Sequence, residues 1–135
     1  MIKVKRIEFF KRLLLGGVGI FAAKYSLHAE TVSVRDIYLD SLYIAGFQYY
    51  EGQNQLKNLK ENLPVTLKRQ SENKHDFFAV EVYFGNHKLG YLPRSDNRII
   101  ARMMDQGLKL KATIRKINPD ADPFWKVKIR VYSEM

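Results

Sequence analysis

Runs in which apolar and polar residues alternate constrain the fold of this chain more than any other feature of its sequence. In WKVKIRV, at 125–131, the apolar side chains from Trp125 to Val131 share one face of an extended strand, because successive side chains of a strand point to opposite faces. The opposite face carries Lys126, Lys128 and Arg130. The run predicts a half-buried strand whose basic face is either solvated or a track for phosphates, and the sequence leaves both readings open.

Further short runs, including an apolar one closed by Gly46, predict the rest of a sheet. Gly85-Asn86 is a turn signal between two of them and predicts a hairpin. The loop NPDADP separates the last two runs of the chain. The remaining predicted strands are LYIAG (42–46), VTLKR (65–69), AVEVYF (79–84), KLGYLP (88–93) and LKLKATI (108–114).

One segment has clear helical features. A helix is predicted over about 95–106, with Ser95 or Asp96 as its N-terminal cap and Gly107 at its end. A second, short helix is a candidate at 54–63 (NQLKNLKENL), where leucines recur at helical spacing. The apolar stripe predicted to face the core consists of Ile99, Ile100, Met103 and Met104. These elements predict a mainly β fold, a small OB-like or SH3-like barrel of five to six strands with one capped helix.

The first thirty residues have the anatomy of an export signal. A basic segment ends at Arg12, an uncharged run extends from Leu13 to Ala23, and Ala29 is a candidate cleavage position. The run is shorter than the ~20 residues that a membrane span needs. We expect a signal-like segment at 1–30, a linker at 31–40 and the folded domain at 41–135. An exported, periplasmic or envelope-associated protein follows from this reading; the alternatives are a cytoplasmic protein and membrane association through the N-terminal segment.

Composition excludes several classes of chemistry. The chain has no cysteine, and its three histidines lack the spacing of a metal signature. The sequence contains no phosphate loop, no dinucleotide fingerprint and no nucleophile motif, so we expect no catalytic residue, no metal and no cofactor. The net charge of +9 suits an anionic partner such as nucleic acid, although about half of it lies in the first 31 residues.

Three segments, read in order, resemble the HIRAN domain family. They are YIAGFQYYEG (43–52), VTLKRQSENKHDFFAVEVYF (65–84) and KLGYLPR (88–94). The shared pattern is a glycine before an aromatic pair, an arginine-ended strand, an Asn and an Asp before A-[IV]-x-V, and a final G-[YH]-[IL]-P. The resemblance covers roughly residues 41–117.

The resemblance implies a compact OB-like barrel that binds single-stranded DNA and, in related helicases, captures its 3′ end. Exposed tyrosines stack on bases, a carboxylate accepts a hydrogen bond from a terminal hydroxyl, and an arginine binds phosphate. His75 and Gln48 stand where the end-binding helicase domains have an aromatic and a basic residue. The binding residues implied for this chain are Tyr49, Tyr50, Asn73, His75, Asp76, Tyr91 and Arg94.

Plainer readings stay open for the same residues. One ring of the Tyr49–Tyr50 pair can be core, Tyr91 can be core, and Asn73 with Asp76 can simply hydrogen-bond their own loop. The expected function is a non-enzymatic, single-stranded nucleic-acid-binding domain with a 3′ DNA end as partner. The alternative is an exported module that keeps the fold, binds a protein partner and does not bind DNA.

Overall fold

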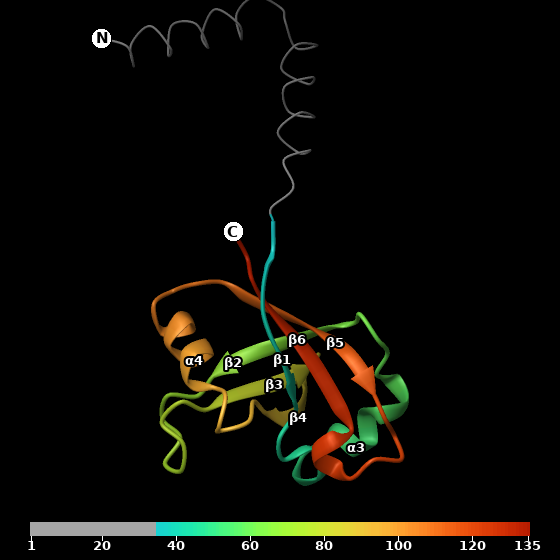
Figure 1. Cartoon of the computed structure of the whole chain (residues 1–135). Helices are drawn as coiled ribbons and strands as arrows, with labels where there is room; N and C mark the ends of the chain where they lie inside the picture. Colours follow the sequence, from blue (N-terminus) through green and yellow to red (C-terminus); the bar gives the residue numbers. More distant parts are fainter. Residues whose placement is uncertain (1–34) are drawn as a thin grey trace, which may run out of the picture. The chain divides into compact units, whose positions relative to one another are not determined.

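A computed structural model describes residues 35–135 of the chain (Figure 1). Six strands form a single sheet, and short helical segments join them. The strands are β1 (Ile37–Tyr43), β2 (Pro64–Arg69), β3 (Val80–Phe84), β4 (His87–Tyr91), β5 (Leu110–Ile117) and β6 (Val127–Ser133). The helices are α3 (Gly52–Gln55) and α4 (Arg98–Asp105), and the 3-10 turns are η1 (Phe47–Tyr49), η2 (Leu56–Asn58) and η3 (Pro123–Trp125).

The sheet has the order β1-β6-β5-β2-β3-β4, and every neighbouring pair is antiparallel. Strand β2 joins its two halves, since Pro64 and Val65 pair with β5 while Thr66 to Arg69 pair with β3. The two edges approach each other at one bridge, where Ala45 and Tyr91 exchange backbone hydrogen bonds of 2.8 and 2.9 Å. The predicted mainly β, OB-like fold is confirmed.

Gly90 makes this bridge possible. Its φ is 152°, and a Cβ built at this position would lie 2.3 Å from the backbone oxygen of Ala45. No side chain fits at that distance, so only glycine lets β4 approach the residues that follow β1. The glycine of the GYLP motif is therefore explained by close packing of backbone.

The core lies inside the curved sheet and collects one side chain from every second position of the strands. Strand β6 shows this most clearly, because Val127, Ile129 and Val131 are fully buried while Lys128 and Arg130 are not. Phe47, Ile44, Leu89, Leu92 and Ile114 are the largest of the other fully buried apolar side chains. The alternation read from the sequence therefore separates core from surface correctly in this strand.

The structure corrects two details of the predicted helix. It begins at Arg98 with Asn97 in the N-terminal cap position, and neither Ser95 nor Asp96 caps it. The predicted apolar stripe is not uniformly core: Ile100 is buried and Met104 packs against the core, but Ile99 is 71% exposed. Four apolar residues span too wide an arc of a helix for one sheet edge to cover all of them.

Two strand boundaries also differ from the predictions. Trp125 lies in η3 and is half exposed, because Pro123 starts a 3-10 turn before β6 begins at Val127. Strand β1 begins at Ile37, inside the segment predicted as a linker. The predicted export signal lies outside the described residues and stays a prediction. Within 35–135, no helix is long and apolar enough to span a membrane.

Candidate nucleic-acid interface

The tyrosine pair lies on a tight turn between β1 and α3. Gly46 adopts a left-handed conformation (φ 72°) and starts η1, which buries Phe47 and leaves Tyr49 77% and Tyr50 39% exposed. The ring of Phe47 packs on Gly52, where a Cβ would lie 2.5 Å from it. The two glycines that flank the pair therefore let the chain turn and let Phe47 anchor the turn, so both tyrosines point outward. Neither ring is core.

Glu51 fastens this turn to β4. Its carboxylate accepts hydrogen bonds from the backbone N–H of Lys88 at 3.1 Å and lies 3.2 Å from Nδ1 of His87. Its own N–H donates to the carbonyl of Lys88 at 2.9 Å. Tyr50 is thereby held over the strand that carries Tyr91, and the two rings meet edge to face with centroids 5.7 Å apart.

Lys88 lies against both of these rings. Its ammonium is 4.2 Å from the centroid of Tyr50 and 4.2 Å from that of Tyr91, and it donates to the Tyr91 hydroxyl at 2.7 Å. Glu81 is more distant, at 3.9 Å. A cation between two aromatic faces stabilises the arrangement of the rings, and it also puts a positive charge next to the surface on which a base would stack.

A chain of hydrogen bonds continues from Tyr91 into the loop before β3. The Tyr91 hydroxyl donates to Oε1 of Gln70 at 2.7 Å, and the same oxygen accepts from the side-chain amide of Asn73 at 2.9 Å. Oδ1 of Asn73 accepts from the backbone N–H groups of His75 and Asp76 at 2.8 and 2.9 Å. Asn73 therefore shapes its own loop and links that loop to the aromatic cluster.

Asp76 has a structural role of its own. Its Oδ1 accepts from the backbone N–H of Phe78 at 3.0 Å, and its Oδ2 accepts from the side chain of Asn97 at 2.7 Å. Asn97 is 1% exposed and stands at the start of α4. The carboxylate thus joins the 70s loop to α4, which is the loop-forming role expected as the plainer reading for Asn73 and Asp76.

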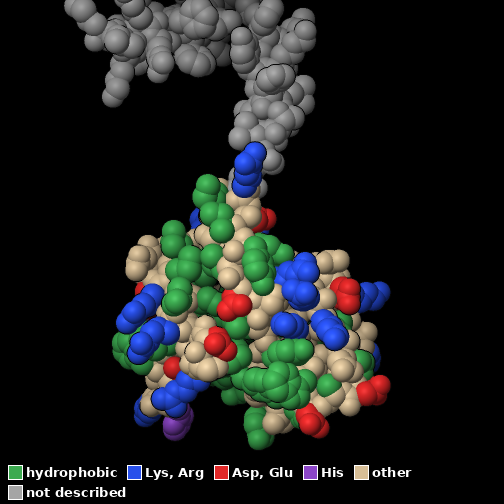
Figure 2. Space-filling view, viewed as in Figure 1, with side chains coloured by type: hydrophobic (Ala, Val, Ile, Leu, Met, Phe, Trp, Pro, Cys, Tyr) green, Lys and Arg blue, Asp and Glu red, His purple; other side chains and the backbone are tan. Residues whose placement is uncertain are grey.

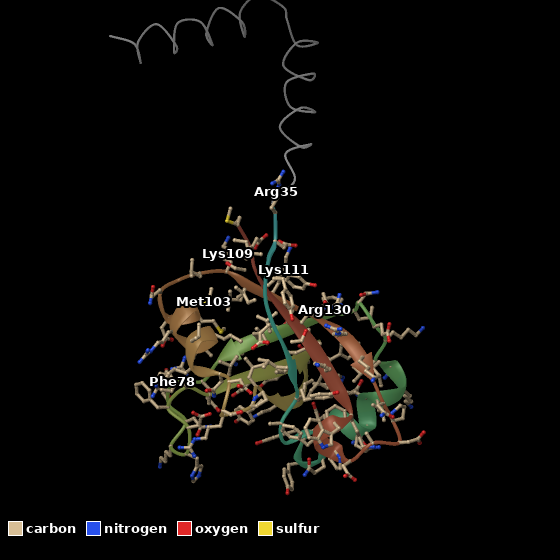
Figure 3. The ribbon with its side chains drawn as sticks, viewed as in Figure 1. Arg35, Phe78, Met103, Lys109, Lys111 and Arg130 are labelled. Carbon is tan, nitrogen blue, oxygen red and sulfur yellow. The ribbon has the colours of Figure 1, made fainter. Side chains whose placement is uncertain are left out.

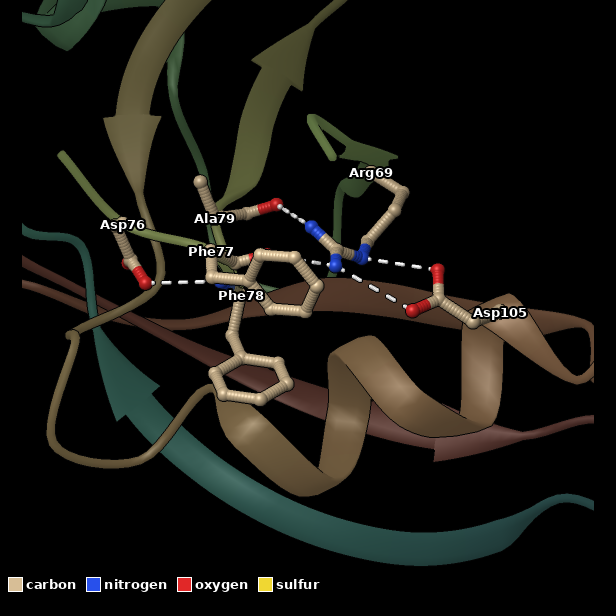
Figure 4. Close-up of polar contacts among 6 residues, drawn as sticks. All are labelled: Arg69, Asp76, Phe77, Phe78, Ala79 and Asp105. Atoms are coloured by element: carbon tan, nitrogen blue, oxygen red, sulfur yellow. Dashed lines mark hydrogen bonds and ion pairs between the residues drawn. The ribbon is translucent and has the colours of Figure 1, made fainter. Parts of the chain in front are cut away.

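Arg69 clamps the same loop from the other side (Figure 4). Its guanidinium donates to the carbonyl oxygens of Ala79 and Phe77 at 3.0 and 2.8 Å, and it pairs with Asp105 of α4 at 3.0 Å. This accounts for the arginine that ends the predicted strand. The side chain supports the loop and α4, and its hydrogen bonds use four of the five donors of the guanidinium.

Glu81 lies buried beneath the tyrosines. It is 6% exposed, it pairs with Tyr91 across the β3–β4 ladder, and its Oε2 accepts no hydrogen bond within the described part of the chain. The proximity of this carboxylate, together with burial, raises the pKa of Tyr83 to about 12. Burial also raises the pKa of Tyr50, although Lys88 opposes that shift. The raised pKa values favour the neutral, hydrogen-bond-donating forms of Tyr50 and Tyr83.

The structure brings four of the seven predicted residues into one connected cluster, namely Tyr50, Asn73, Asp76 and Tyr91. Tyr49, His75 and Arg94 are exposed, and among the described residues their side chains form no hydrogen bond or ion pair. Three free side chains around a braced cluster leave groups available for a ligand.

Sequence reasoning missed Gln70, Glu81, Lys88 and Asn97. Gln70 follows a predicted strand, and the other three lie inside predicted elements, but none carries a signal for a binding role. Gln70, Lys88 and Asn97 reach the cluster through contacts with distant segments. The one local signal was Glu81, a charge inside the apolar run AVEVYF. Within residues 35–135, no group of three or more acidic or histidine side chains could hold a metal.

Comparisons with known proteins show the family and the fold. The HIRAN domain family matches residues 39–135. A crystal structure of a protein from Lactobacillus plantarum is similar, with 26% sequence identity and a TM-score of 0.67; the match covers 76% of this chain and 98% of that one.

The crystal structure of the HIRAN domain of human HLTF is also similar, with 18% identity and a TM-score of 0.53. This match covers 73% of this chain and 78% of that one, and at this identity it shows a shared fold. Among curated proteins, none matches the sequence.

Proposed function

This chain belongs to the HIRAN domain family, and from that premise we propose that it binds single-stranded nucleic acid at the Tyr49–Tyr50 turn and recognises a free 3′-hydroxyl end. Family membership supports a nucleic-acid-binding domain. In this proposal the chain acts by binding alone, and single-stranded DNA with a free 3′ end is its ligand.

The exposed ring of Tyr49 beside the braced ring of Tyr50 is the observation that carries the proposal. Aromatic side chains on which bases stack contribute about 1–3 kcal/mol per base, without sequence preference. Tyr49 is 77% exposed on a turn fixed by Gly46 and Glu51, so the backbone that carries its ring is held in place before any ligand arrives. A ligand that stacks on this ring therefore orders one side chain and no backbone, which keeps the entropic cost of binding low.

Asp76 supplies the selectivity for the end. A carboxylate offers about four lone-pair sites, and the two hydrogen bonds that Asp76 accepts leave part of this capacity free. The half-buried carboxylate can accept one more bond from a terminal hydroxyl, and its charge repels a terminal phosphate. Arg94 is exposed just past β4, and in this proposal it binds an internal phosphate.

The test is fluorescence anisotropy of the whole chain with short labelled single strands that end in either a 3′-hydroxyl or a 3′-phosphate. We expect tighter binding to the hydroxyl end, retained as salt rises. Asp76→Asn keeps an acceptor oxygen for the loop and removes the charge, so it should reduce this preference more than it reduces overall affinity. Asp120→Asn, an exposed loop carboxylate, is the matched control.

Wild-type protein that binds both ends equally would contradict end recognition. Absence of binding to any single strand would favour the alternative, an exported protein-interaction module. The signal-like N-terminal sequence motivates that alternative. Fractionation of the whole chain with the cell envelope, together with a cross-linked protein partner, would support it.

A further inference from the structure

A second basic and aromatic surface lies on the outer face of β1, β6 and β5. Cross-strand pairing places Tyr43, Lys128 and Lys116 in one row across the three strands, and Ser41, Arg130 and Thr113 in the next. Residues directly opposite each other in an antiparallel pair project from the same side of the sheet. Since Val127, Ile129 and Val131 fill the core, the rows face outward. We call Lys116, Lys128, Arg115 and Arg130 the β5–β6 cations.

These cations lack acidic partners. Among residues 35–135 no ion pair includes any of the four. Arg115 hydrogen-bonds only to the hydroxyl of Ser41, at 3.4 Å, and Lys128 lies over the ring of Tyr43 at 5.1 Å. Lys116 and Lys128 are direct cross-strand neighbours, and like charges in that position destabilise a sheet. An anion bound between them would remove this repulsion.

Aromatic side chains border the cations on the side of the tyrosine turn. Trp125 meets Tyr43 edge to face at 4.9 Å and Phe124 at 4.6 Å, and both η3 rings are 40% exposed or more. Figure 2 shows Lys and Arg side chains gathered beside a hydrophobic patch on this face, and Figure 3 labels Arg130 on it.

The surface is continuous with the candidate site. Turn η3 packs against η1, which carries Tyr49, and the N–H of Ile44 donates to the carbonyl of Val127 at 2.9 Å. A strand stacked on Tyr49 would therefore meet η3 before it reached the β5–β6 cations. Lys128 and Arg130 lie about 7 Å apart along β6, so the two rows extend the contact by further nucleotides.

We propose that the β5–β6 cations bind the phosphates of the upstream part of the same single strand whose 3′ end occupies the Tyr49–Tyr50 turn. The inference rests on the proposed function and names the ligand more closely: a single strand of several nucleotides. Site sizes of about 4–16 nucleotides per OB fold agree with a path of this kind. Charge complementarity selects a polyanion, and the flanking exposed rings suit unpaired bases better than a duplex.

The test compares labelled strands of about 4 and about 16 nucleotides, both with a free 3′-hydroxyl, bound to the whole chain at several salt concentrations. The double variant Lys116→Gln/Lys128→Gln should leave the short strand unaffected. It should lose most of the extra affinity for the long strand, and its salt slope should fall by about 1.4, since each phosphate contact on a single strand contributes about 0.7. When salt rises from about 50 to 200 mM, the double variant should therefore lose about sevenfold less affinity than the wild type.

Arg102→Gln/Lys109→Gln is the matched control, because it removes the same charge from α4 and the loop that follows it. If this control lowers the affinity and the salt slope for the long strand equally, net charge alone explains the effect and the proposal is overturned. An unchanged length dependence in Lys116→Gln/Lys128→Gln would overturn it as well. The melting temperature of the test variant should not fall, because it removes a like-charge pair.

The short strand separates failure of the end site from failure of the track. If the wild type does not bind the short strand, the proposed function fails. The proposal for the β5–β6 cations then stands only if Lys116→Gln/Lys128→Gln still lowers the salt slope for the long strand. Vesicles containing phosphatidylserine supply the second arm. Vesicle binding that the double variant abolishes, without any length dependence on DNA, would overturn the proposal in favour of a lipid surface.

Discussion

The two basic and aromatic faces of this domain differ in how their polar groups are used. On the β3–β4 face, Lys88, Tyr91, Gln70 and Asn73 form an unbroken series of contacts that ends at Asp76 and α4. On the β1–β6–β5 face, the β5–β6 cations have no ion-pair partner within the described residues, and two of them oppose each other directly.

Under the two proposals, this difference corresponds to two kinds of recognition. A braced cluster holds its groups in fixed positions, so it suits a ligand whose end must be read in detail. Long side chains free of ion pairs keep their rotamer freedom and suit a repeating charge, for which position matters less than sign. If the β3–β4 face depends on its hydrogen bonds and backbone bridge, removing them should lower the free energy of unfolding. Removing an exposed ring should leave that free energy unchanged.

The largest effect is expected from Gly90→Ala. A Cβ at this position would lie 2.3 Å from the oxygen of Ala45, so the bridge that holds Tyr91 to Ala45 must open. We expect a loss of more than about 3 kcal/mol in the free energy of unfolding, from backbone strain and two lost hydrogen bonds. Urea denaturation measures it.

Gly85→Ala is the control for Gly90→Ala. Gly85 also has positive φ, 57°, but an added Cβ would meet nothing within 4 Å. Its loss should stay near the ~1–2 kcal/mol of left-handed strain alone. Equal losses in the two variants would show that the bridge contributes little and that the β3–β4 face is held by its side chains.

Tyr49→Ala should separate binding from stability. We expect a loss of about 1–3 kcal/mol in single-strand affinity, because one stacking ring disappears. The free energy of unfolding should change by less than about 0.5 kcal/mol, since the ring is 77% exposed. Anisotropy and urea denaturation measure the two quantities. Ile99→Ala, a 71% exposed apolar residue of α4, should change neither, and a comparable loss of affinity there would argue against a specific stacking role.

Tyr91→Phe tests the bracing of the β3–β4 face. The ring stays, but Lys88 loses an acceptor and Gln70 loses a donor, so we expect a loss of about 1–2 kcal/mol in the free energy of unfolding. Tyr38→Phe removes an exposed hydroxyl that donates to Ser41 at 3.0 Å, and its loss should be below about 0.5 kcal/mol. If both variants lose the same free energy of unfolding, the contacts of Tyr91 contribute no more to stability than an exposed hydrogen bond does.

The smallest effect concerns alkaline pH. The pKa of Tyr83 is raised from 10.0 to about 12, so the folded state holds this proton more tightly than the unfolded chain does. The associated stability is complete below pH 10 and is lost as pH rises toward 12. A difference absorbance titration of the wild type against Tyr83→Phe isolates this phenol among the eight tyrosines. Glu81→Gln should return its pKa toward 10; an unmoved pKa would mean that burial, not Glu81, causes the shift.

Local patterns in the sequence were sufficient for most elements of the fold, although β1 begins five residues before its predicted run and the candidate helix at 54–63 is replaced by α3 and η2. Alternation located the strands because side chains alternate between the two faces of any strand, and Gly85-Asn86 located the β3–β4 hairpin because few residues tolerate that turn. The predicted boundaries were wrong at Trp125, which precedes β6, and at the N-terminal cap of α4. In both places a neighbouring residue, Pro123 or the buried Asn97, determined where the element began.

The candidate site divides in the same way. The resemblance to the HIRAN family implied Tyr49, Tyr50, Asn73, Asp76 and Tyr91 as a group. Their partners could not be found from spacing, because Gln70 reaches Tyr91 across 21 positions, Asn97 reaches Asp76 across 21, and Glu51 reaches Lys88 across 37.

The two edges of the sheet meet at the backbone bridge between Ala45 and Tyr91, and no local pattern in the sequence encodes this pair. The sequence alone therefore predicted most of the strands and turns and, through the family resemblance, the residue types that a nucleic-acid site would use. The tertiary structure established which tyrosines are exposed, which carboxylates are occupied and which cations lie free of ion pairs, because burial and hydrogen bonding arise only when distant segments meet.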